Sequence, residues 1–539
     1  MEKGMTFTSL VLGIIGTVFI SASSFYVVLK YGALPWPTIM AALVSMFFLS
    51  LFGKRNKNEI NVTHTIMSAG SMVAGGVAFT VPAYILLGGD VNDIDPVILL
   101  ITILIGSVLG ALLSFMIRRK LIDDSSLEFP IGTAAYELVN NGNDKKNMLY
   151  VLLGSLFSGI LSVFRDISFR PGKAPFIPTT YVFRDGLISF YVSPLLVGIG
   201  YILGFLNTFT WFLGGALTYW LARPYALKNG INDFDIMKNS FGMGFIIGIG
   251  LSIIVKIVFF NKKDSKTKSS KFYIIFTALI FVAVLTFVYK LPVFFALLVI
   301  LITVISAVIA GYTTGKTGVN PMEIYAIITI LAVTFLNSLF NTFSIDNTVF
   351  SIIFKGKIPE LILFLLACIV SVACGLAGDV LNDFKAGSKL KTSPYAQLAG
   401  EIIGAVVSSF VITFLFFVFF RVYKNIGPSA SNPDLIVFQA SIISSIVKGI
   451  PFMNIFLIGI GAGFVLNLLR LPVLTFGIGI YLPIALTIPV FLGGFISFLF
   501  SVFPKKPADS AMFFANGLMA GEAVIGVIIS IIAYIKLFY

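Results

Sequence analysis

Long apolar runs recur from one end of the chain to the other, separated by short polar breaks. A helix rises about 1.5 Å per residue, so roughly 20 residues cross the hydrocarbon core of a bilayer. The pattern therefore predicts an all-α polytopic membrane protein. Bounded by charges or turn residues, the runs predict spans over 6–29, 33–52, 60–88, 95–117, 146–164, 187–223, 236–260, 272–289, 293–311, 322–344, 358–383, 399–422, 452–469, 473–503 and 508–537.

Four segments depart from simple crossing helices. The amphipathic segments 129–141 and 434–448 are too short to cross, so they are predicted as re-entrant or interfacial helices. The runs 187–223 and 473–503 are long enough to be broken or doubled. Hydropathy thus predicts about 14 to 17 spans.

Composition agrees with a membrane protein and excludes other classes. Apolar residues make up 58% of the 539 residues and charged residues only 11%, whereas soluble domains carry about 25% charged residues. This excludes a soluble multidomain enzyme, a disordered chain and a disulfide scaffold. The two cysteines, Cys368 and Cys374, lie in one apolar run and offer no bridging framework.

The charges indicate an orientation. The breaks at 53–58 and 118–120 are basic, whereas the break between them, at 89–95, holds three aspartates and no basic residue. Basic breaks face the cytosol, so the amino terminus is predicted to be cytosolic in a plasma membrane. The first run is predicted to remain as a span, because residues 1–5 are too short for a cleavable signal. The net charge of +13 indicates this orientation and contact with anionic lipid, rather than nucleic-acid binding.

The two halves of the chain resemble each other. The polar linker 261–271, with five lysines, separates 1–260 from 272–539, and each half is predicted to be one transmembrane repeat. Residues 198–215 align with 477–494 without a gap at an offset of 279, and 30-KYGALPWP pairs with 316-KTGVNP at an offset of 286. Internal repeats are common in secondary transporters, with the substrate site at their interface. Independent selection of glycine-rich helix packing is the alternative.

Few charges interrupt the predicted spans, and those at membrane depth are functional candidates because their burial is costly. Asp379 and Asp383 are four residues apart and point one way if the helix continues, so their carboxylates form a candidate proton carrier. Alternatively the helix ends near Gly387, with Asp383 and Lys385 at an exposed terminus. The other candidates of this kind are Gln397, Glu401, which shares a helix face with Gln397, and Glu522, which follows a glycine in an apolar helix.

Other candidates lie in the first half and in the predicted helix breaks. His64 is the single histidine, with Asn61 three residues before it; a satisfied helix-end residue is the alternative interpretation. One histidine and two apolar cysteines predict no metal site and no cofactor. Proline before 131-IGTAAYELVNN predicts a short capped helix that presents Tyr136 and Glu137 to a pore or substrate. Backbone of a broken helix is predicted at Gly214, Gly215, Pro483, Pro489, Gly493 and Gly494.

The order of five motifs resembles the oligopeptide transporter family, which includes peptide carriers and yellow-stripe-like carriers of metal–chelator complexes. The resemblance covers nearly the whole chain and is stronger on the prokaryotic and yellow-stripe-like side. It implies about 16 spans arising by duplication, proton-coupled uptake, and peptides or peptide-like chelates as substrates. The motifs are 61-NVTHTIMSAG, 118-RRKLIDDSSLEFPIGTAAYELV, 378-GDVLNDFKAG with TSPYAQLAGEIIGAVV, 478-IGIYLPIALTIPVFLGG and 517-GLMAGEAVIGV.

The chain departs from that family at three positions. Ser71 stands where the family usually has an acidic residue, His64 replaces its usual glutamine, and Ile131 replaces the glutamate of its Phe-Pro-Glu-Gly motif. The resemblance thus implies that the remaining acids, Asp379, Asp383, Glu401 and Glu522, carry the coupling. Asp383, Lys385, Gly387, Gln397 and Glu522 match the family pattern.

The predicted function is secondary active transport of small oligopeptides or peptide-like metal chelates by proton symport. Large apolar surfaces also allow a homo-oligomer in the bilayer. The chain has no Gly-x4-Gly-Lys-Ser/Thr loop for a nucleotide. One alternative is a membrane-embedded lipid-linked transferase, for which Asp123-Asp124 and 232-NDFD are the acidic candidates, although a solvated loop accounts for both. A passive channel is the other.

Overall fold

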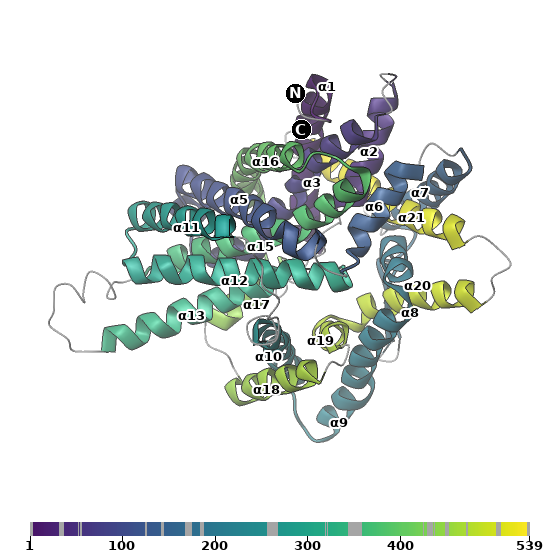
Figure 1. Cartoon of the computed structure of the whole chain (residues 1–539). Helices are drawn as coiled ribbons and strands as arrows, with labels where there is room; N and C mark the ends of the chain where they lie inside the picture. Colours follow the sequence, from purple (N-terminus) through teal and green to yellow (C-terminus); the bar gives the residue numbers. More distant parts are fainter. Residues whose placement is uncertain are drawn as a thin grey trace. The chain divides into compact units, whose positions relative to one another are not determined.

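The computed structural model consists almost entirely of helices (Figure 1). It describes residues 4–31, 37–51, 53, 56–123, 127–141, 145–167, 175–183, 188–255, 268–318, 320, 322–342, 358–423, 425–427, 435, 437–447, 452–469, 473–502 and 508–535. Several predictions fall partly outside these residues, namely those on the linker at 261–267, on Asp124, on the basic break at 54–55 and on the motif at 32–36.

The chain forms two compact units. The first comprises Met1–Phe129 with Lys262–Gly449, and the second comprises Pro130–Asn261 with Ile450–Tyr539. Each unit therefore combines helices from both predicted halves of the sequence.

The first unit is built around α15, a helix of 31 residues that packs against α3, α5, α12 and α13. Its helices are α1 (Phe7–Tyr31), α2 (Pro37–Leu51), α3 (Lys57–Thr80), α4 (Pro82–Leu86), η1 (Val91–Asp93), α5 (Pro96–Arg118), η2 (Arg119–Asp123), α11 (Lys268–Tyr289), α12 (Val293–Thr317), α13 (Met322–Thr342), α15 (Glu360–Leu390), α16 (Pro394–Val422) and α17 (Phe438–Val447).

In the second unit, α10 packs against α18, and α7 packs against α21. The two helices of each pair lie side by side in Figure 1. Its elements are α6 (Pro130–Asn141), α7 (Lys145–Asp166), β1 (Thr180–Phe183), β2 (Ile188–Tyr191), α8 (Pro194–Ala216), η3 (Leu217–Ala222), α9 (Arg223–Lys228), α10 (Phe234–Val255), α18 (Met453–Leu468), α19 (Val473–Tyr481), α20 (Ile484–Val502) and α21 (Ala508–Ile535). The strands β1 and β2 form an antiparallel hairpin.

Helix lengths confirm the predicted class of fold. In the described part of the chain, ten helical stretches are long and apolar enough to cross a membrane. The short segments predicted at 129–141 and 434–448 form α6 and α17, which are too short to cross. The prediction for 187–223 was wrong at its start, because 188–191 form strand β2. Helix α8 begins at Pro194, where the Ser193 side chain accepts a hydrogen bond from the Leu196 N–H and caps the helix.

Both long apolar runs contain a break, as predicted. Helix α8 has non-helical backbone at Gly204, with φ 76° and ψ 168°, a conformation open to glycine and costly for other residues. The run 473–503 is interrupted between α19 and α20, at Leu482 and Pro483. Gly204 and Pro483 are separated by an offset of 279, the one at which these two runs align.

Glycines bring these two runs into backbone contact at reciprocal positions. A Cβ added at Gly200 would overlap the Val490 carbonyl oxygen, and one added at Gly479 would overlap that of Trp211. Gly479 follows Gly200 at the offset of 279, and Val490 follows Trp211 at the same offset. A Cβ added at Gly214 would likewise overlap the Phe476 carbonyl oxygen, and one added at Gly493 would overlap that of Val197. These two contacts are also related by the offset of 279. Every one of these contacts thus has its counterpart at the same offset.

We expect Gly200→Ala and Gly479→Ala to lower thermal stability by similar amounts, each by about 1–3 kcal/mol, because the added methyl meets backbone that cannot move aside. Melting of the purified protein in detergent measures this. Gly461→Ala is the control, since a Cβ there meets nothing within 4 Å. This variant should be neutral or stabilising, because alanine favours helix over glycine. Equal effects at all three positions would contradict the packing argument.

The two short helices α6 and α17 begin in the same unusual way. Phe129 precedes α6 with φ 48°, and Val437 precedes α17 with φ 43°. The Phe129 N–H donates to the Gly315 carbonyl near the end of α12, at 2.9 Å, and the Val437 N–H donates to the Leu29 carbonyl near the end of α1, at 2.8 Å. Positive φ is costly for bulky and β-branched residues, so the surrounding structure imposes it at the start of each helix.

Candidate functional site

A cluster of buried acids lies where α3, α15 and α16 pack together in the first unit. Asp379 and Asp383 project from α15, and Glu401 projects from α16. All three are buried, and each of the aspartates lies close enough to Glu401 for their charges to interact. Helix α15 continues past Gly387 to Leu390, so Asp383 is not at an exposed helix end. The burial of Asp383 therefore excludes the alternative in which Asp383 and Lys385 form an exposed helix end near Gly387.

His64 and Ser68 on α3 contact the Asp383 carboxyl group. The His64 Nε2 lies 3.1 Å from Asp383 Oδ1, and the Ser68 hydroxyl donates to Oδ2 at 2.5 Å. Positions four apart on a helix share one face, so α3 presents both groups to α15 together. His64 is fully buried within α3, rather than at a helix end as the alternative interpretation had it.

Gln397 connects the carboxyl-terminal part of α15 to α16. Its Nε2 donates to the Asp383 backbone carbonyl at 2.7 Å. A Cβ added at Gly387 would overlap the Gln397 side-chain amide, so glycine at this position allows the helices to approach. The predicted residues Asp383, Gly387, Gln397 and Glu401 thus belong to one junction between α15 and α16.

Several polar atoms of the cluster have no hydrogen-bond partner in the described part of the chain. They are both carboxylate oxygens of Glu401, His64 Nδ1, Asp379 Oδ2 and both amide atoms of Asn61. Buried polar groups are ordinarily hydrogen-bonded, so atoms left open in this way indicate space for water, an ion or an exchangeable proton.

Lys385 does not pair with Asp383. Its Nζ donates to the Leu127 carbonyl at 2.8 Å and lies 5.8 Å from the centre of the Phe129 ring. The lysine therefore holds the segment that leads to Phe129. Tyr136 and Glu137, both half-buried, lie on α6 in the second unit.

Glu522, the remaining predicted acid, forms a saturated ion pair in the second unit. Arg165 donates to Glu522 Oε1 at 2.6 Å, and the Leu195 N–H donates to Oε2 at 2.8 Å. The Ser193 hydroxyl lies within hydrogen-bond distance of both oxygens. Arg165 also donates to both oxygens of Asp166. The pair therefore joins α21 to the end of α7 and to the first turn of α8.

Tyr191 on β2 completes this ion-pair site. The Arg165 guanidinium lies 5.5 Å from the centre of its ring. Burial raises the pKa of Tyr191 to about 12, so its phenol stays neutral at physiological pH. The neutral ring covers the cation without adding a charge to the pair.

The glycines and prolines predicted as broken-helix backbone have different locations. Pro483 lies at the break between α19 and α20, whereas Pro489 lies inside α20. Gly214 and Gly215 lie within α8, and Gly493 and Gly494 within α20. In the structure these four glycines are sites of close helix contact. The non-helical position in α8 is Gly204.

Several residues of both sites are not among those predicted from the sequence. Ser68 could have been predicted from the sequence, because it lies four residues after His64 and therefore on the same face of a helix. Arg165 and Ser193 carry none, since their partner Glu522 lies 357 and 329 positions away in the chain. Thr38 donates to Asp379 Oδ1 at 2.7 Å across a similar separation. Such partners become visible only in the folded chain.

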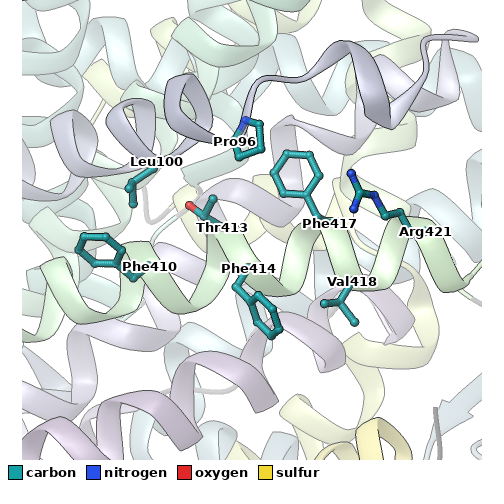
Figure 2. Close-up of a pocket in the computed structure, with 8 residues that line it drawn as sticks. All are labelled: Pro96, Leu100, Phe410, Thr413, Phe414, Phe417, Val418 and Arg421. Atoms are coloured by element: carbon teal, nitrogen blue, oxygen red, sulfur yellow. The ribbon is translucent and has the colours of Figure 1, made fainter. Parts of the chain in front are cut away.

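A groove of about 370 Å³ lies apart from the acid cluster, between the start of α5 and the outer face of α16 (Figure 2). Its lining is almost entirely apolar, and Phe410 and Phe414 along it are more than half exposed. Because none of the clustered acids lines the groove, it is a feature of the apolar surface rather than part of this site.

Comparison with known proteins decides the family. A model of the family described as "OPT oligopeptide transporter protein" matches residues 4–241 and 260–533. This chain belongs to the oligopeptide transporter family. It is 24% identical to a Haemophilus influenzae protein named "Putative oligopeptide transporter", over 94% of this chain and 92% of that one. It is 22% identical to the metal-nicotianamine transporter YSL1 of Arabidopsis thaliana, over 96% and 89% of the two chains.

Membership in the oligopeptide transporter family confirms a multi-pass membrane transporter. It favours this interpretation over the lipid-linked transferase, because the relatives are transporters. The structure also locates two departures of this transporter from the family pattern. Ser71 is buried within α3, and Ile131 is buried in the first turn of α6.

Proposed function

We propose that this transporter carries small oligopeptides or peptide-like metal chelates across the plasma membrane by proton symport. The observation that carries the proposal is the contact of His64 and Ser68 with Asp383 beside the open carboxyl group of Glu401, within a bundle of membrane-spanning helices. The names of the relatives support the substrate class, since they denote transporters of oligopeptides and of metal–nicotianamine.

The proposed proton carrier is the Asp383–His64 pair with Glu401. Ionising the carboxyl groups of Asp379, Asp383 and Glu401 together would gather like charges in a region of low dielectric. Among the residues that the structure describes, His64 is the basic side chain in contact with Asp383. A proton that enters or leaves these groups changes the charge of the site without requiring a large backbone movement. Intramembrane acids and histidines serve as proton relays in pumps and transporters for this reason.

We propose further that the transporter arose by duplication of a unit now represented by 1–260 and 272–539, with 261–271 as a basic cytosolic linker. The reciprocal glycine contacts between α8 and α19–α20 at the offset of 279 support this. So do the matching backbone conformations at the start of α6 and of α17. Under the duplication, α7 corresponds to α18 and α10 corresponds to α21. The packed pair α7–α21 then corresponds to the packed pair α18–α10.

The proposed orientation has a cytosolic amino terminus, because the break near 118–120 is basic and that near 89–95 is acidic. A homo-oligomer in the bilayer is proposed from the exposed apolar side chains along α7 and α18, such as Phe157 and Ile458. Crosslinking of the protein in native membranes tests the oligomer, and protease accessibility of an amino-terminal tag tests the orientation.

Uptake by proteoliposomes tests the transport proposal. We expect di- to hexapeptides, or an iron–nicotianamine complex, to enter faster under an inward proton gradient than without one, and to carry protons measurable with a trapped pH dye. Vesicles without protein, and vesicles with the gradient collapsed by an ionophore, are the controls. Uptake that is indifferent to the gradient would contradict symport, and single-channel currents would indicate a passive pore instead.

A further inference from the structure

Lys238 is a buried lysine of the second unit. It lies in the second turn of α10, and its side chain is only 9% exposed. Its Nζ donates to the Tyr219 hydroxyl at 2.9 Å and to the Tyr481 carbonyl at 3.5 Å. It also lies 5.1 Å from the centre of the Tyr219 ring. One ammonium group thus joins α10 to η3 and to the last residue of α19.

The charge of Lys238 has no acid in direct contact. Among the residues that the structure describes, no carboxylate lies within ion-pair distance of its Nζ. Asp235 on α10 and Arg223 on α9 act on the ammonium from further away, and their charges oppose each other. The atoms that the ammonium contacts are the neutral oxygens of a phenol and a carbonyl. A buried cation ordinarily has a paired anion, so this one suits an anion that comes from outside the chain.

Donors remain for such an anion. A lysine ammonium has three N–H groups, and the two contacts of Lys238 use two of them. Tyr219 accepts the bond from Lys238 through its oxygen, so its own O–H points elsewhere and can donate. One ammonium and one phenol, 2.9 Å apart, therefore offer two hydrogen bonds to the same group.

Lys238 lies at the break between α19 and α20. Tyr481 is the last residue of α19, and Leu482 and Pro483 interrupt the run. A Cβ added at Gly242, four residues after Lys238 on the same face of α10, would lie 3.3 Å from Tyr481 Cα. Helix α10 thus packs closely on the break. Broken membrane helices contribute to substrate sites in secondary transporters, so the position suits recognition of the cargo.

The other repeat has no counterpart of this lysine. At the offset of 279, the equivalent residues are Gly517 for Lys238, Phe498 for Tyr219 and Ile202 for Tyr481. None of these three has a polar side-chain atom. The break at Gly204, which is equivalent to Pro483, therefore forms without a lysine. Packing that is common to both repeats does not require Lys238, so the lysine has a role specific to one repeat.

We propose that Lys238 and the Tyr219 hydroxyl bind a carboxylate of the transported molecule. The proposal rests on the proposed function for the class of cargo, because a peptide ends in a carboxylate and nicotianamine also carries carboxylates. Hydrogen bonds between an ammonium and a carboxylate are stronger than those between neutral groups. The carboxylate supplies the anion that the described residues do not place against Lys238.

Melting of the purified full-length protein in detergent tests the site. The probes are a library of di- to hexapeptides with free carboxyl termini, the same library with amidated termini, and iron–nicotianamine. A ligand that binds the folded state raises the melting temperature as its occupancy increases. We expect the free-acid library or iron–nicotianamine to raise it, and the amidated library to require at least about tenfold higher concentrations.

Three variants separate the groups. Lys238→Met should lower the affinity for the active probe at least about tenfold and abolish the preference for the free acid. Tyr219→Phe retains the cation and should lower the affinity about three- to tenfold, so it tests the site even if Lys238→Met does not fold. Lys228→Met is the matched control, because Lys228 is an exposed lysine in the last turn of α9. It should bind like the wild type.

A lysine that serves only to hold Tyr481 gives a different result. Lys238→Met would then melt at a lower temperature without ligand but retain the wild-type affinity, and this outcome would overturn the site. Equal affinity for the two libraries, or no shift with any probe, would overturn it as well. Each variant is compared with itself without ligand, so a general loss of stability does not affect the comparison.

The two proposals fail in distinguishable ways. Binding that depends on Lys238 without uptake by proteoliposomes leaves the carboxylate site in place and contradicts the proposed transport activity. Proton-driven uptake that is equal for the two libraries and unchanged in Lys238→Met contradicts the carboxylate site and leaves the transport proposal in place.

Discussion

Replacing Asp383 by asparagine is expected to reduce proton-driven uptake about ten- to a hundredfold while the protein still folds. The asparagine side chain has nearly the same shape and retains contacts to His64 and Ser68, but it cannot carry a proton between them. Those contacts become hydrogen bonds to a neutral amide, which are weaker by about 1–2 kcal/mol than bonds to a carboxylate, and each 1.4 kcal/mol corresponds to a factor of ten; the lost proton transfer adds to this. Initial uptake rates in proteoliposomes, together with the melting temperature of each preparation, measure the effect.

Asp123→Asn is the control for this substitution. Asp123 lies 3.6 Å from Arg118 at a partly exposed position, so the loss of its charge should leave uptake unchanged. His64→Gln, which restores the residue usual in the family, provides a second readout. If His64 and Asp383 act together, the double variant should lose less than the sum of the two single losses. Wild-type uptake with an unchanged pH profile in Asp383→Asn would refute the proposed carrier.

Replacing Arg165 by methionine is expected to destabilise the protein by about 3–5 kcal/mol, because it leaves the buried Glu522 carboxylate without its cation. The substitution also removes the donor to the Val192 carbonyl, which Arg165 contacts at 2.6 Å. Glu522→Gln should be milder, since its amide oxygen still accepts hydrogen bonds from Ser193 and Leu195. Melting in detergent and the yield of monodisperse protein measure both variants.

The double variant Arg165→Met with Glu522→Gln separates loss of the pair from loss of packing. Arg165→Met leaves two buried carboxylates, those of Glu522 and Asp166, without their cation, and the double variant leaves only that of Asp166, so it should be more stable than Arg165→Met alone. Arg118→Met is the matched control, because its pair with Asp123 is partly exposed and such pairs contribute about 0–1 kcal/mol. Equal destabilisation by the two arginine substitutions would show that the charge of Glu522 does not require Arg165.

These two expectations give the buried acids different roles. Glu522 was predicted as part of a proton pathway, together with Asp379, Asp383 and Glu401. In the structure its carboxylate is saturated by Arg165, Ser193 and the Leu195 N–H, whereas the Glu401 carboxyl group lies beside that of Asp383 and has no N–H or hydroxyl donor in the described part of the chain. The open groups are better suited to exchange a proton. Glu522 is better suited to hold the second unit together.

The sequence by itself determined the class of fold and which two long runs are broken, but it located only the break at Pro483; the break in α8 lies at Gly204 rather than at Gly214 or Gly215. Long apolar runs have few ways to satisfy their backbone polar groups in a bilayer, so length and hydropathy predict helices well. Glycine and proline mark where those helices are interrupted, as in the run that breaks at Pro483. The spacing of Asp379 and Asp383 likewise predicted that their side chains share one face of α15.

The tertiary structure alone decided which distant residues meet. His64 contacts Asp383 across 319 positions of the chain, Thr38 contacts Asp379 across 341, and Arg165 contacts Glu522 across 357. Periodicity describes one helix at a time, and an apolar face does not specify which neighbour covers it. The charge, the open oxygens and the ligand set of each site depend on helix packing, which brings together side chains whose positions in the sequence are unrelated.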